Sequence, residues 1–459
     1  MRYAGIRKTA LPLAVAGAFT GMASQAHASA FALIEQSASG LGTSFAGAAA
    51  SAEDASTIYY NPAGMSLLPS GPQISVGAAF INISTKFSNS TSTQTGTPLV
   101  PATQAPLGGN GGDAGGLATV PNAYFAMDVA RDWKVGLGIS APFGLKTEYD
   151  SDWMGRFQAI KSEIDTINVN PSASYKVNEN VALGFGLSYQ KIDAELTNAV
   201  NFAAATFGAT GSAAAAGAVA AAGQEGTVSV KGSDDAWGYN LGAMFKLNPD
   251  TRLGVSYRSS IKYHVTGTVN FSGVPTATLT GISPALAAAF SNGNVALDIK
   301  MPDSASVALQ HQFDPKWALL ADATWTGWSK IQQLQVVRDN GTTLNTTPEN
   351  FKDTWRFGLG AVYRYTDVWS LKGGLAYDQT PVNNTDRTAR LPDQDRTWLS
   401  VGGQYRLSKD GTLDIGYAHL FVKDSSINQN GGNAFLNGQL TGTYKSSIDI
   451  LGVQFAYRF

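Results

Sequence analysis

Apolar and polar side chains alternate along most of the chain downstream of about Pro72. In residues 450–459, every second side chain is large and apolar or aromatic, and the intervening ones, apart from Ile450, are small or polar. The same division recurs in residues 133–140, 181–190 and 355–365. A period of two is the pattern of a β-strand with two unlike faces. The chain therefore predicts strands that carry apolar side chains on one face and Gly, Ser, Gln or Arg on the other.

The connections between these predicted strands alternate in length. Short turns occur at residues 131–132, 178–180, 248–250, 314–316, 366–367 and 409–411, and long connections lie near 88–118, 146–161, 197–227, 272–293, 339–350, 380–395 and 429–438. Six turns and seven loops join fourteen strands, which is an even number. Alternation of short periplasmic turns with long external loops is typical of bacterial outer-membrane barrels. Both ends of the chain would then lie on the periplasmic side.

Two architectures can use such strands. A soluble sandwich buries its apolar faces against a second sheet, whereas a membrane barrel turns them towards lipid. The alternating loop lengths favour the barrel. Phe459, with Tyr457 and Phe455 spaced by two, is similar to the closing strand of outer-membrane proteins, although an ordinary edge strand could also end in an aromatic residue. We predict an all-β fold, a 14-stranded antiparallel transmembrane β-barrel over residues 71–459, closed because an open edge cannot hydrogen-bond to lipid.

The N-terminal part of the chain lacks the period-two pattern. Residues 1–28 contain a basic start, an apolar stretch and the small-residue sequence Ala26-His27-Ala28, which predict a secretory signal peptide and a mature start at Ser29. Residues 29–70 are rich in Ala, Ser and Gly. On composition they could be a disordered arm or a plug in the lumen. A plug is physically reasonable, because a barrel of fourteen strands is wide enough to leak unless its lumen is filled.

The composition of the chain excludes several classes of functional site. Only 14% of the 459 residues are charged, the formal net charge is -2, and there is no cysteine. Disulfides, thiolate metal sites and cysteine nucleophiles are therefore excluded, and a strongly basic face for nucleic acid is not expected. The Ala/Gly-rich run 202–223 is too weakly apolar for a confident membrane helix, and we expect a surface loop with some helix there.

Several ordered sequence elements resemble the FadL family of outer-membrane transporters of hydrophobic compounds. They include Ser29-Ala30-Phe31-Ala32-Leu33, Ser39-Gly40-Leu41-Gly42, Glu53-Asp54-Ala55, Asn61-Pro62-Ala63, residues 237–240, 257–259, 328–334, 351–353 and 392–396. The resemblance covers essentially the whole mature chain. It implies a fourteen-stranded barrel in the bacterial outer membrane whose lumen holds residues 29–70 as a hatch.

The resemblance also implies site residues. A ligand would land in an external apolar groove, pass to an inner pocket near the start of the hatch, and leave sideways at a kinked third strand. Asn61, Pro62, Ala63 and Gly144 are the implied transport and gating residues, and Phe31 and Phe143 are candidates for the ligand pocket. If the Asn-Pro-Ala element couples the hatch to the third strand, a change in either should stop uptake. The residues alone also allow an ordinary turn at Asn61-Pro62 and an ordinary strand end at Gly144.

The nature of the ligand is less closely specified. We expect a hydrophobic small molecule, a long-chain fatty acid in the first place and a monoaromatic hydrocarbon as the alternative. The positions implied for basic contacts to a carboxylate are Leu196 and Thr347, neither of which is cationic. This departure predicts that uncharged hydrophobes bind at least as well as ionised fatty acids. Arg356, Arg364 and Arg458 could replace the missing cations.

Other function classes fit less well. An outer-membrane lipase would need a base, but none of the three mature histidines stands in a recognisable Ser-His pattern, so we expect no enzymatic activity. A diffusion porin would have no hatch. We expect no catalytic residues, no metal site, no cofactor and no nucleic-acid partner, and we expect a monomer surrounded by outer-membrane lipid.

Overall fold

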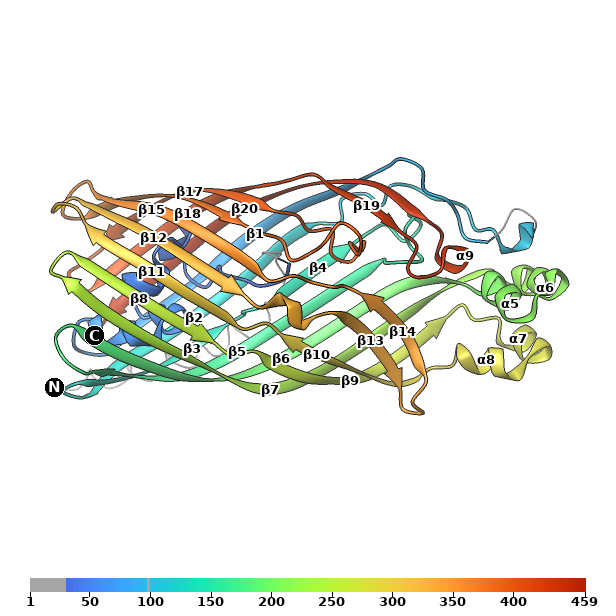
Figure 1. Ribbon diagram of the computed structural model, residues 1–459, viewed down its shortest axis with the longest axis horizontal. Coiled ribbons are helices and arrows are strands. Elements are labelled where there is room, and N and C mark those ends of the chain that lie inside the picture. The colour runs from blue at the N-terminus through green and yellow to red at the C-terminus, as the bar shows by residue number, and fades with distance from the viewer. Residues whose placement is uncertain (1–29, 97–99) are drawn as a thin grey trace, which may run out of the picture.

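The computed structural model describes residues 30–96 and 100–459, which form a closed antiparallel β-barrel (Figure 1). The predicted signal peptide, residues 1–28, and the mature start at Ser29 lie outside the described residues. The barrel has fourteen strands, several of them interrupted, so that the backbone forms 20 strand segments. The fold class predicted from the alternating pattern is therefore confirmed.

The fourteen strands follow one another around the barrel in chain order, and they comprise 20 segments. The segments are β1 Gln73–Asn89, β2 Gly116–Ala130, β3 Trp133–Ser140, β4 Gly144–Glu148, β5 Lys161–Lys176, β6 Val181–Asn201, β7 Glu225–Asn248, β8 Thr251–Arg258, β9 Ile261–Ser272, β10 Gly293–Met301, β11 Ser304–Gln312, β12 Trp317–Thr326, β13 Gln333–Arg338, β14 Thr343–Pro348, β15 Thr354–Arg364, β16 Trp369–Asp378, β17 Arg396–Arg406, β18 Gly411–Val422, β19 Ser425–Gln429 and β20 Leu440–Arg458. The interrupted strands are β3/β4, β8/β9, β10/β11, β12/β13, β14/β15 and β18/β19.

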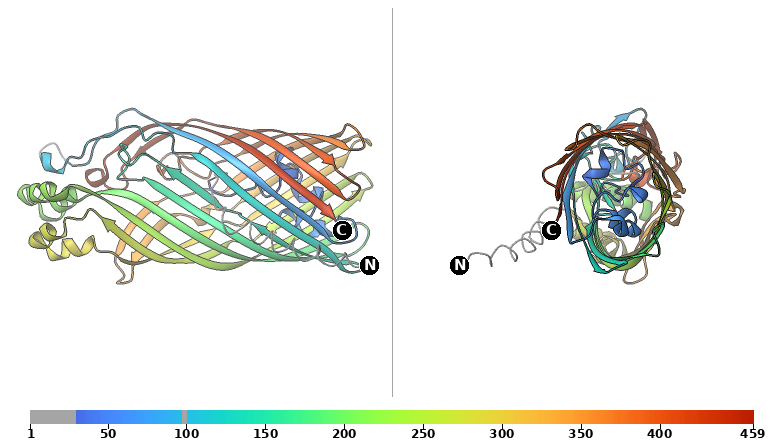
Figure 2. Two further views of the ribbon diagram at one scale, coloured as in Figure 1. Left: turned by 180° about the vertical axis from the view of Figure 1, so that it is seen from behind. Right: turned by 90° about the vertical axis from the view of Figure 1, so that its left-hand side faces the viewer.

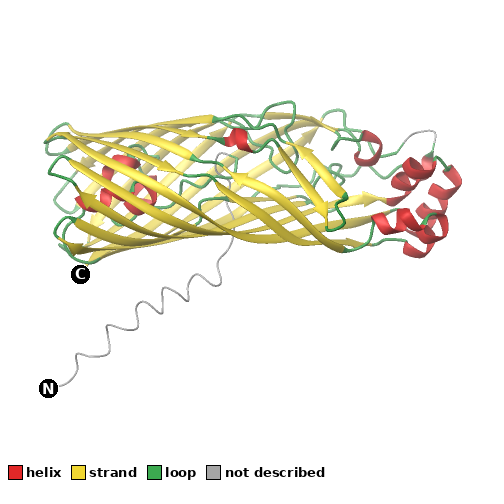
Figure 3. Cartoon of the chain, turned by 60° about the horizontal axis from the view of Figure 1, so that its bottom comes forward, coloured by secondary structure: helices red, strands yellow, loops and turns green. Residues whose placement is uncertain are grey.

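Short helices occupy two places. Inside the barrel lie α2 Ala38–Leu41, α3 Ala48–Ser51, α4 Thr57–Tyr60 and the 3-10 helix η1 Pro62–Leu67. The others belong to the connections between strands: η2 Pro101–Thr103, α5 Phe202–Thr210, α6 Ala213–Gly223, α7 Thr276–Ile282, α8 Pro284–Ala289, η3 Trp328–Lys330 and α9 Ala434–Asn437. Helices α5 to α8 gather at the long-loop end, opposite the end that holds the internal helices (Figure 3).

The first and last strands close the sheet. β1 pairs with β20 from Gln73↔Arg458 to Asn89↔Gly442 and with β2 on its other side. In this long register the chain-terminal aromatic residues stand on the outer face, where Phe455 is 42% exposed. The backbone groups at this seam are therefore hydrogen-bonded to each other, as lipid requires.

The outer face is apolar and bordered by aromatic residues. Leu359 and Leu375, which lie mid-strand, are 66% and 54% exposed. Trp133 and Tyr175, Trp317 and Tyr363, and Trp369 and Tyr405 pair across strands near the short turns, with ring centroids 4.6–4.7 Å apart. An apolar band with aromatic borders matches the environment of a membrane barrel, whose ring-bearing residues lie at the lipid headgroups.

One predicted loop is partly a strand. Residues 339–350 were expected to form a long loop, but Thr343–Pro348 is β14, which pairs with β13 as an extension of the barrel wall. The segment is mainly Thr and Asn and lacks the alternation of apolar and polar side chains, because both of its faces are largely in water. Its β-branched threonines nevertheless favour a strand. By contrast, α5 and α6 confirm the expected helix within residues 202–223.

The N-terminal segment, residues 30–68, fills the lumen at the short-turn end (Figure 2). Its apolar side chains, such as Leu41 and Phe45, pack against wall residues that include Ile81, Trp398 and Ile450. Lys372 of β16 contacts Glu53 at 2.6 Å and also bonds to the Ser39 carbonyl. Apolar packing and polar contacts thus both hold the segment against the inner wall.

Candidate functional site

The third strand is interrupted between β3 and β4. β3 ends at Ser140 and β4 begins at Gly144. Both segments pair with β5, but β2 pairs with β3 only as far as Ala123↔Ile139. Pro142 lies in the break, and a proline cannot donate a ladder hydrogen bond. The sheet is therefore locally unzipped between the outer part of β2 and β4.

The start of the N-terminal segment occupies this break. The Leu33 N–H donates to the Pro142 carbonyl at 2.8 Å, and the Gly144 N–H donates to the Phe31 carbonyl at 2.9 Å. Ala32 and Phe143 face each other between these two bonds. Residues 31–33 thus act as a short replacement strand, held by two backbone hydrogen bonds rather than by a continuous ladder.

Aromatic side chains surround the same place. The Phe31 ring lies 4.7 Å from Trp328 and 6.1 Å from Phe143, centroid to centroid, and Phe351 is 6.1 Å from Trp328. Trp328 lies in η3, where the ninth strand is interrupted between β12 and β13. Phe31, Phe143 and Trp328 are all at most 7% exposed. The break is therefore backed by a cluster of rings on the lumen side.

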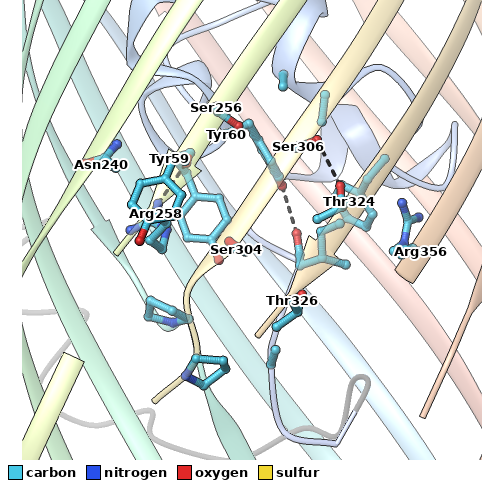
Figure 4. Close-up of a pocket in the computed structure, with 18 of the residues that line it drawn as sticks. Tyr59, Tyr60, Asn240, Ser256, Arg258, Ser304, Ser306, Thr324, Thr326 and Arg356 are labelled. Atoms are coloured by element: carbon cyan, nitrogen blue, oxygen red, sulfur yellow. Dashed lines mark hydrogen bonds between the residues drawn. The ribbon is translucent and has the colours of Figure 1, made fainter. Parts of the chain in front are cut away.

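A cavity of about 160 Å³ lies next to this aromatic cluster. Its apolar lining includes Leu33, Ile34, Phe45, Phe143 and Trp328. Phe31 packs behind Phe143 and Trp328 and is absent from the described lining. The polar part of the lining comes from the facing strands and carries serine, threonine and two arginines (Figure 4).

The two arginines differ in their partners. Arg356 bonds to the Ser44 carbonyl, lies 3.4 Å from Asp322 and stands over the Trp398 ring. Arg258 stacks on Tyr59, with its guanidinium carbon 4.5 Å from the ring centroid, and donates to the Tyr59 carbonyl at 2.8 Å. The cavity therefore combines an apolar wall with two fixed guanidinium groups and with the carboxyl groups of Asp322 and Asp378.

The Asn61-Pro62-Ala63 element is fixed at the opposite side of the N-terminal segment. The buried Asn61 amide donates to the carbonyls of Ala49 at 2.7 Å and Ala243 at 3.1 Å. Its side-chain oxygen accepts from the Ala63 N–H, so Asn61 caps η1, and Pro62 takes the first position, which suits proline. Residues 31–33 make the backbone hydrogen bonds at the break in the third strand, and the 3-10 helix η1 that begins at Pro62 also lies against β3. That Asn61-Pro62-Ala63 couples the N-terminal segment to this strand stays a prediction.

Lumen-facing glycines make room for this element. A Cβ atom on Gly242 would lie 2.0 Å from the Asn61 side-chain oxygen, and one on Gly184 would lie 2.1 Å from the Ala63 nitrogen. A Cβ on Gly254 would meet the Ala49 carbonyl at 1.9 Å. Strands β6, β7 and β8 thus present a glycine-lined seat against which the backbone of the segment lies directly.

Glu35 is an unusual member of the N-terminal segment. It is fully buried, and neither carboxyl oxygen has a hydrogen-bond partner outside its own residue within the described parts of the chain. Burial raises the pKa of Glu35 to about 7, against the lowering effects of its own backbone N–H and of Arg396. Burial likewise raises the pKa of Tyr59 and Tyr60, whose neutral hydroxyls donate to the carbonyls of Leu33 and Ile34.

Apolar clusters connect the outer helices with the aromatic cluster. Phe202, Val219 and Leu279 form an apolar core among α5, α6 and α7, and Val200 joins it to a second cluster on the inner faces of β7, β9, β10 and β13. Val295 and Val336 of that second cluster lie beside Val265 and Leu297, which pack with the cluster that contains Phe143 and Trp328. Apolar surface therefore continues from the long-loop end down to the break in the third strand.

Leu196 belongs to this apolar surface and pairs with Val230 of β7. Thr347 lies in β14 and accepts a hydrogen bond from Asn345. Of the arginines named as replacements, only Arg356 lines the cavity. Arg458 pairs with Asp410 at the short-turn end of the barrel. Arg364 is the last residue of β15 and also lies at the short-turn end.

Sequence reasoning missed Arg258, Trp328 and Glu35 as parts of the site. Arg258 and Trp328 each come at the end of a run of alternating apolar and polar side chains, where a strand is interrupted. That position is at most a weak indication in the sequence that they belong to the site. Glu35 stands among small and apolar residues in a segment with few charges, and that contrast could have marked it. No cluster of metal-ligating side chains occurs among residues 30–96 and 100–459. In the same described ranges, no helix is both long and apolar enough to cross a bilayer.

Comparisons with known proteins agree with this geometry. Residues 19–459 match the model of a family described as outer membrane protein transport protein (OMPP1/FadL/TodX). The chain is 30% identical to the long-chain fatty acid transport protein of Escherichia coli K12 over 92% of this chain and 93% of that protein. It is 32% identical to a putative outer membrane protein of Neisseria meningitidis serogroup B over the full length of both. The crystal structure of a Pseudomonas aeruginosa FadL homologue has a TM-score of 0.82 at 26% identity, covering 94% of this chain and all of that one.

Proposed function

Because this chain belongs to the outer membrane protein transport protein family (OMPP1/FadL/TodX), we propose that it carries long-chain fatty acids into the cell and releases them sideways through the break in its third strand. The protein is an outer-membrane transporter of hydrophobic molecules. The fatty-acid class is supported by the name of the Escherichia coli relative. The sideways release and the residues that control it rest on the geometry of this chain.

The observation that carries the proposal is the continuous apolar surface that ends at an unzipped strand. A hydrocarbon chain loses about 0.8 kcal/mol of stabilisation for each methylene that returns to water. The apolar clusters from α5 and α7 to Phe143 offer such a chain a dry path. At its end, the wall is closed by two backbone hydrogen bonds from residues 31–33 and by the two hydrogen bonds of the Gln36 amide with Ala141. Exit into the lipid therefore avoids a passage through water.

Residues 29–70 serve as a hatch and residues 71–459 as the barrel in this mechanism. The first residues of the hatch must leave the break for a ligand to pass, while the rest must stay in place to prevent leakage. Asn61 supports the second requirement, because its buried amide bonds both to the hatch and to β7. Pro62 and Ala63 lie against the glycine-lined seat. The cavity beside Phe143 is the place where ligand would wait before release.

Uptake of labelled oleate by cells that carry the wild type, Asn61→Ala or Gly144→Trp tests this mechanism. Removing the Asn61 amide leaves buried carbonyls without donors, which costs the hatch about 1–3 kcal/mol. A tryptophan at Gly144 would obstruct the break where Gly144 now bonds to Phe31. We expect uptake to fall in both variants, while heat-modifiable mobility on gels shows that the barrel still folds.

Ser66→Ala is the matched control. Ser66 lies in the same 3-10 helix as Pro62, and within the described chain its buried hydroxyl has no partner, so its loss should leave uptake unchanged. Wild-type uptake in Asn61→Ala and Gly144→Trp would contradict sideways release and favour an axial pore. Toluene uptake in the same cells tests the alternative substrate class: faster uptake of toluene than of oleate would replace the fatty acid in the proposal.

A further inference from the structure

The inner cavity is lined by two arginines and by Asp322 and Asp378, and one of the two guanidinium groups makes no direct ion pair. Arg356 is neutralised by Asp322, which also lines the cavity. For Arg258, no carboxylate lies within 4.0 Å in the described parts of the chain. Its partners are the Tyr59 carbonyl at 2.8 Å and the Ser188 hydroxyl at 3.4 Å, and the second of these contacts is long. A guanidinium has five N–H donors, so Arg258 has N–H groups left for a further acceptor.

The position of Arg258 is fixed from two sides. The guanidinium stacks on the Tyr59 ring, which belongs to the hatch, while the backbone of Arg258 ends β8 in the barrel wall. Figure 4 shows Arg258 lying against Tyr59, with Arg356 on the other side of the cavity. A stacked guanidinium loses little further freedom when it binds a ligand. The arrangement is thus prepared for a planar, two-oxygen anion.

The rest of the cavity wall indicates what that anion is attached to. Leu33, Ile34, Phe143 and Trp328 supply apolar surface that reaches the break in the third strand. A half-buried cation at one end and an apolar lining at the other match a molecule with a carboxylate head and a hydrocarbon tail. An uncharged aromatic hydrocarbon would leave Arg258 without a carboxylate in direct contact.

We infer that Arg258 binds the carboxylate of the transported molecule, with the hydrocarbon tail directed towards Phe143 and Trp328, so that this residue selects ionised acids over neutral hydrophobes. The inference rests on the proposed function, because it takes the cavity as the place where ligand waits. It reverses the preference for uncharged ligands that Leu196 and Thr347 suggested. The cation is present in this chain, but it comes from β8.

Binding of oleate and of its methyl ester to purified protein at pH 8.5 tests the inference. The variants are Arg258→Met, which removes the charge and keeps an unbranched apolar side chain, and Arg258→Lys, which keeps the charge and loses the planar fork. Arg252→Met is the matched control. Arg252 lies on the same inward face of β8, bonds to Gln310 and is not part of the described cavity lining.

We expect the wild type to bind oleate more tightly than methyl oleate. A charge-assisted pair of hydrogen bonds should make Arg258→Met about 10- to 100-fold weaker for oleate, with little change for the ester. Arg258→Lys should recover part of the loss, and Arg252→Met should behave as the wild type. Unchanged oleate affinity in Arg258→Met, or an equal loss for both ligands, would overturn the inference.

The test of fatty-acid transport gives a result that can be distinguished from the test of Arg258. If the wild type binds neither oleate nor its ester, and cells take up no oleate, the transport of fatty acids itself is wrong. If Arg258→Met does not fold, the wild-type comparison still decides: equal affinities for oleate and methyl oleate would overturn the role of Arg258, whether or not uptake proceeds.

Discussion

Single buried polar residues control how the hatch is held in this barrel. Asn61 satisfies two carbonyls, one in the hatch and one in the wall, and therefore joins two parts of the chain that are far apart in sequence. Glu35 does the opposite, because its carboxyl group is buried with no partner outside its own residue in the described chain. One residue adds stability at every pH, whereas the contribution of the other depends on its protonation.

Glu35 should make the hatch less stable as the pH rises. Its pKa increases from the ordinary value of 4.5 to about 7 on burial, so the folded hatch binds a proton more tightly than the unfolded hatch does. Stability is then fully present below about pH 4.5 and is lost as the pH rises to about 7, by roughly 3 kcal/mol at most. Glu35→Gln stays neutral and should abolish this dependence.

Hydrogen exchange of the hatch amides, corrected for the intrinsic rate, measures this effect. In the wild type, protection of residues 30–68 should decrease between pH 5 and pH 8, whereas in Glu35→Gln it should stay level. Amides of β1 and β20 provide the internal reference, because they lie in the closed seam of the barrel. Equal pH dependence in the two proteins would show that Glu35 is not buried as a neutral acid.

At the scale of elements, the sequence predicts the wall well and the site less well. Alternation such as that in residues 355–365 depends only on which side chains face lipid, so it can be seen in the sequence. Pro142 likewise marks the interruption of the third strand, and a proline can be recognised from the sequence alone. The pairing of residues 31–33 with Pro142 and Gly144 joins segments more than a hundred residues apart, and no local pattern encodes it. Arg258 lies in one of the elements that resemble the family, but its place in the cavity was not predicted, because it depends on contact with Tyr59.

A disulfide between the hatch and the third strand should lock the exit. Ala32 and Phe143 face each other between two backbone hydrogen bonds, as a non-hydrogen-bonded pair of antiparallel strands does. Such pairs bring their Cα atoms to about 4.5 Å, within the range of a disulfide, and the chain has no cysteine of its own to compete. Oxidised Ala32→Cys/Phe143→Cys protein should stop taking up oleate, and reduction should restore it.

The control pair lies in the seam of the barrel, where no movement is needed. Ser84 and Ser447 are partners in β1 and β20, so Ser84→Cys/Ser447→Cys should transport oleate in both redox states. Phe143→Cys alone reports what the loss of the aromatic ring does by itself. Unimpaired uptake by the oxidised Ala32/Phe143 pair, with the cross-link verified by mass spectrometry, would exclude movement of residues 31–33 as the opening step.

At the scale of the whole molecule, the barrel and the hatch obey different physical requirements. The wall is stabilised by a closed ladder of backbone hydrogen bonds and by apolar side chains in lipid. The hatch is held by local contacts such as Lys372 with Glu53 and Ser44 with Ser400. The wall partners in these contacts are polar lumen residues, which water could solvate if the hatch were absent. Stability of the wall and closure of the lumen are therefore separable.

Deletion of residues 30–68 should consequently leave a folded but open barrel. The seam between β1 and β20 does not involve the deleted residues, so the protein should still insert and show heat-modifiable mobility. With the hatch gone, the lumen of a fourteen-stranded barrel is wide enough for an aqueous channel. Planar bilayers should then show steady ion conductance that the intact protein lacks, and oleate binding should weaken because Tyr59, Leu33 and Ile34 no longer complete the cavity. If the protein that lacks residues 30–68 inserts but does not conduct, the long loops and not the hatch seal the barrel. The loop of residues 380–395 would then be the first candidate, since its buried Val382 and Leu391 already pack inside the wall.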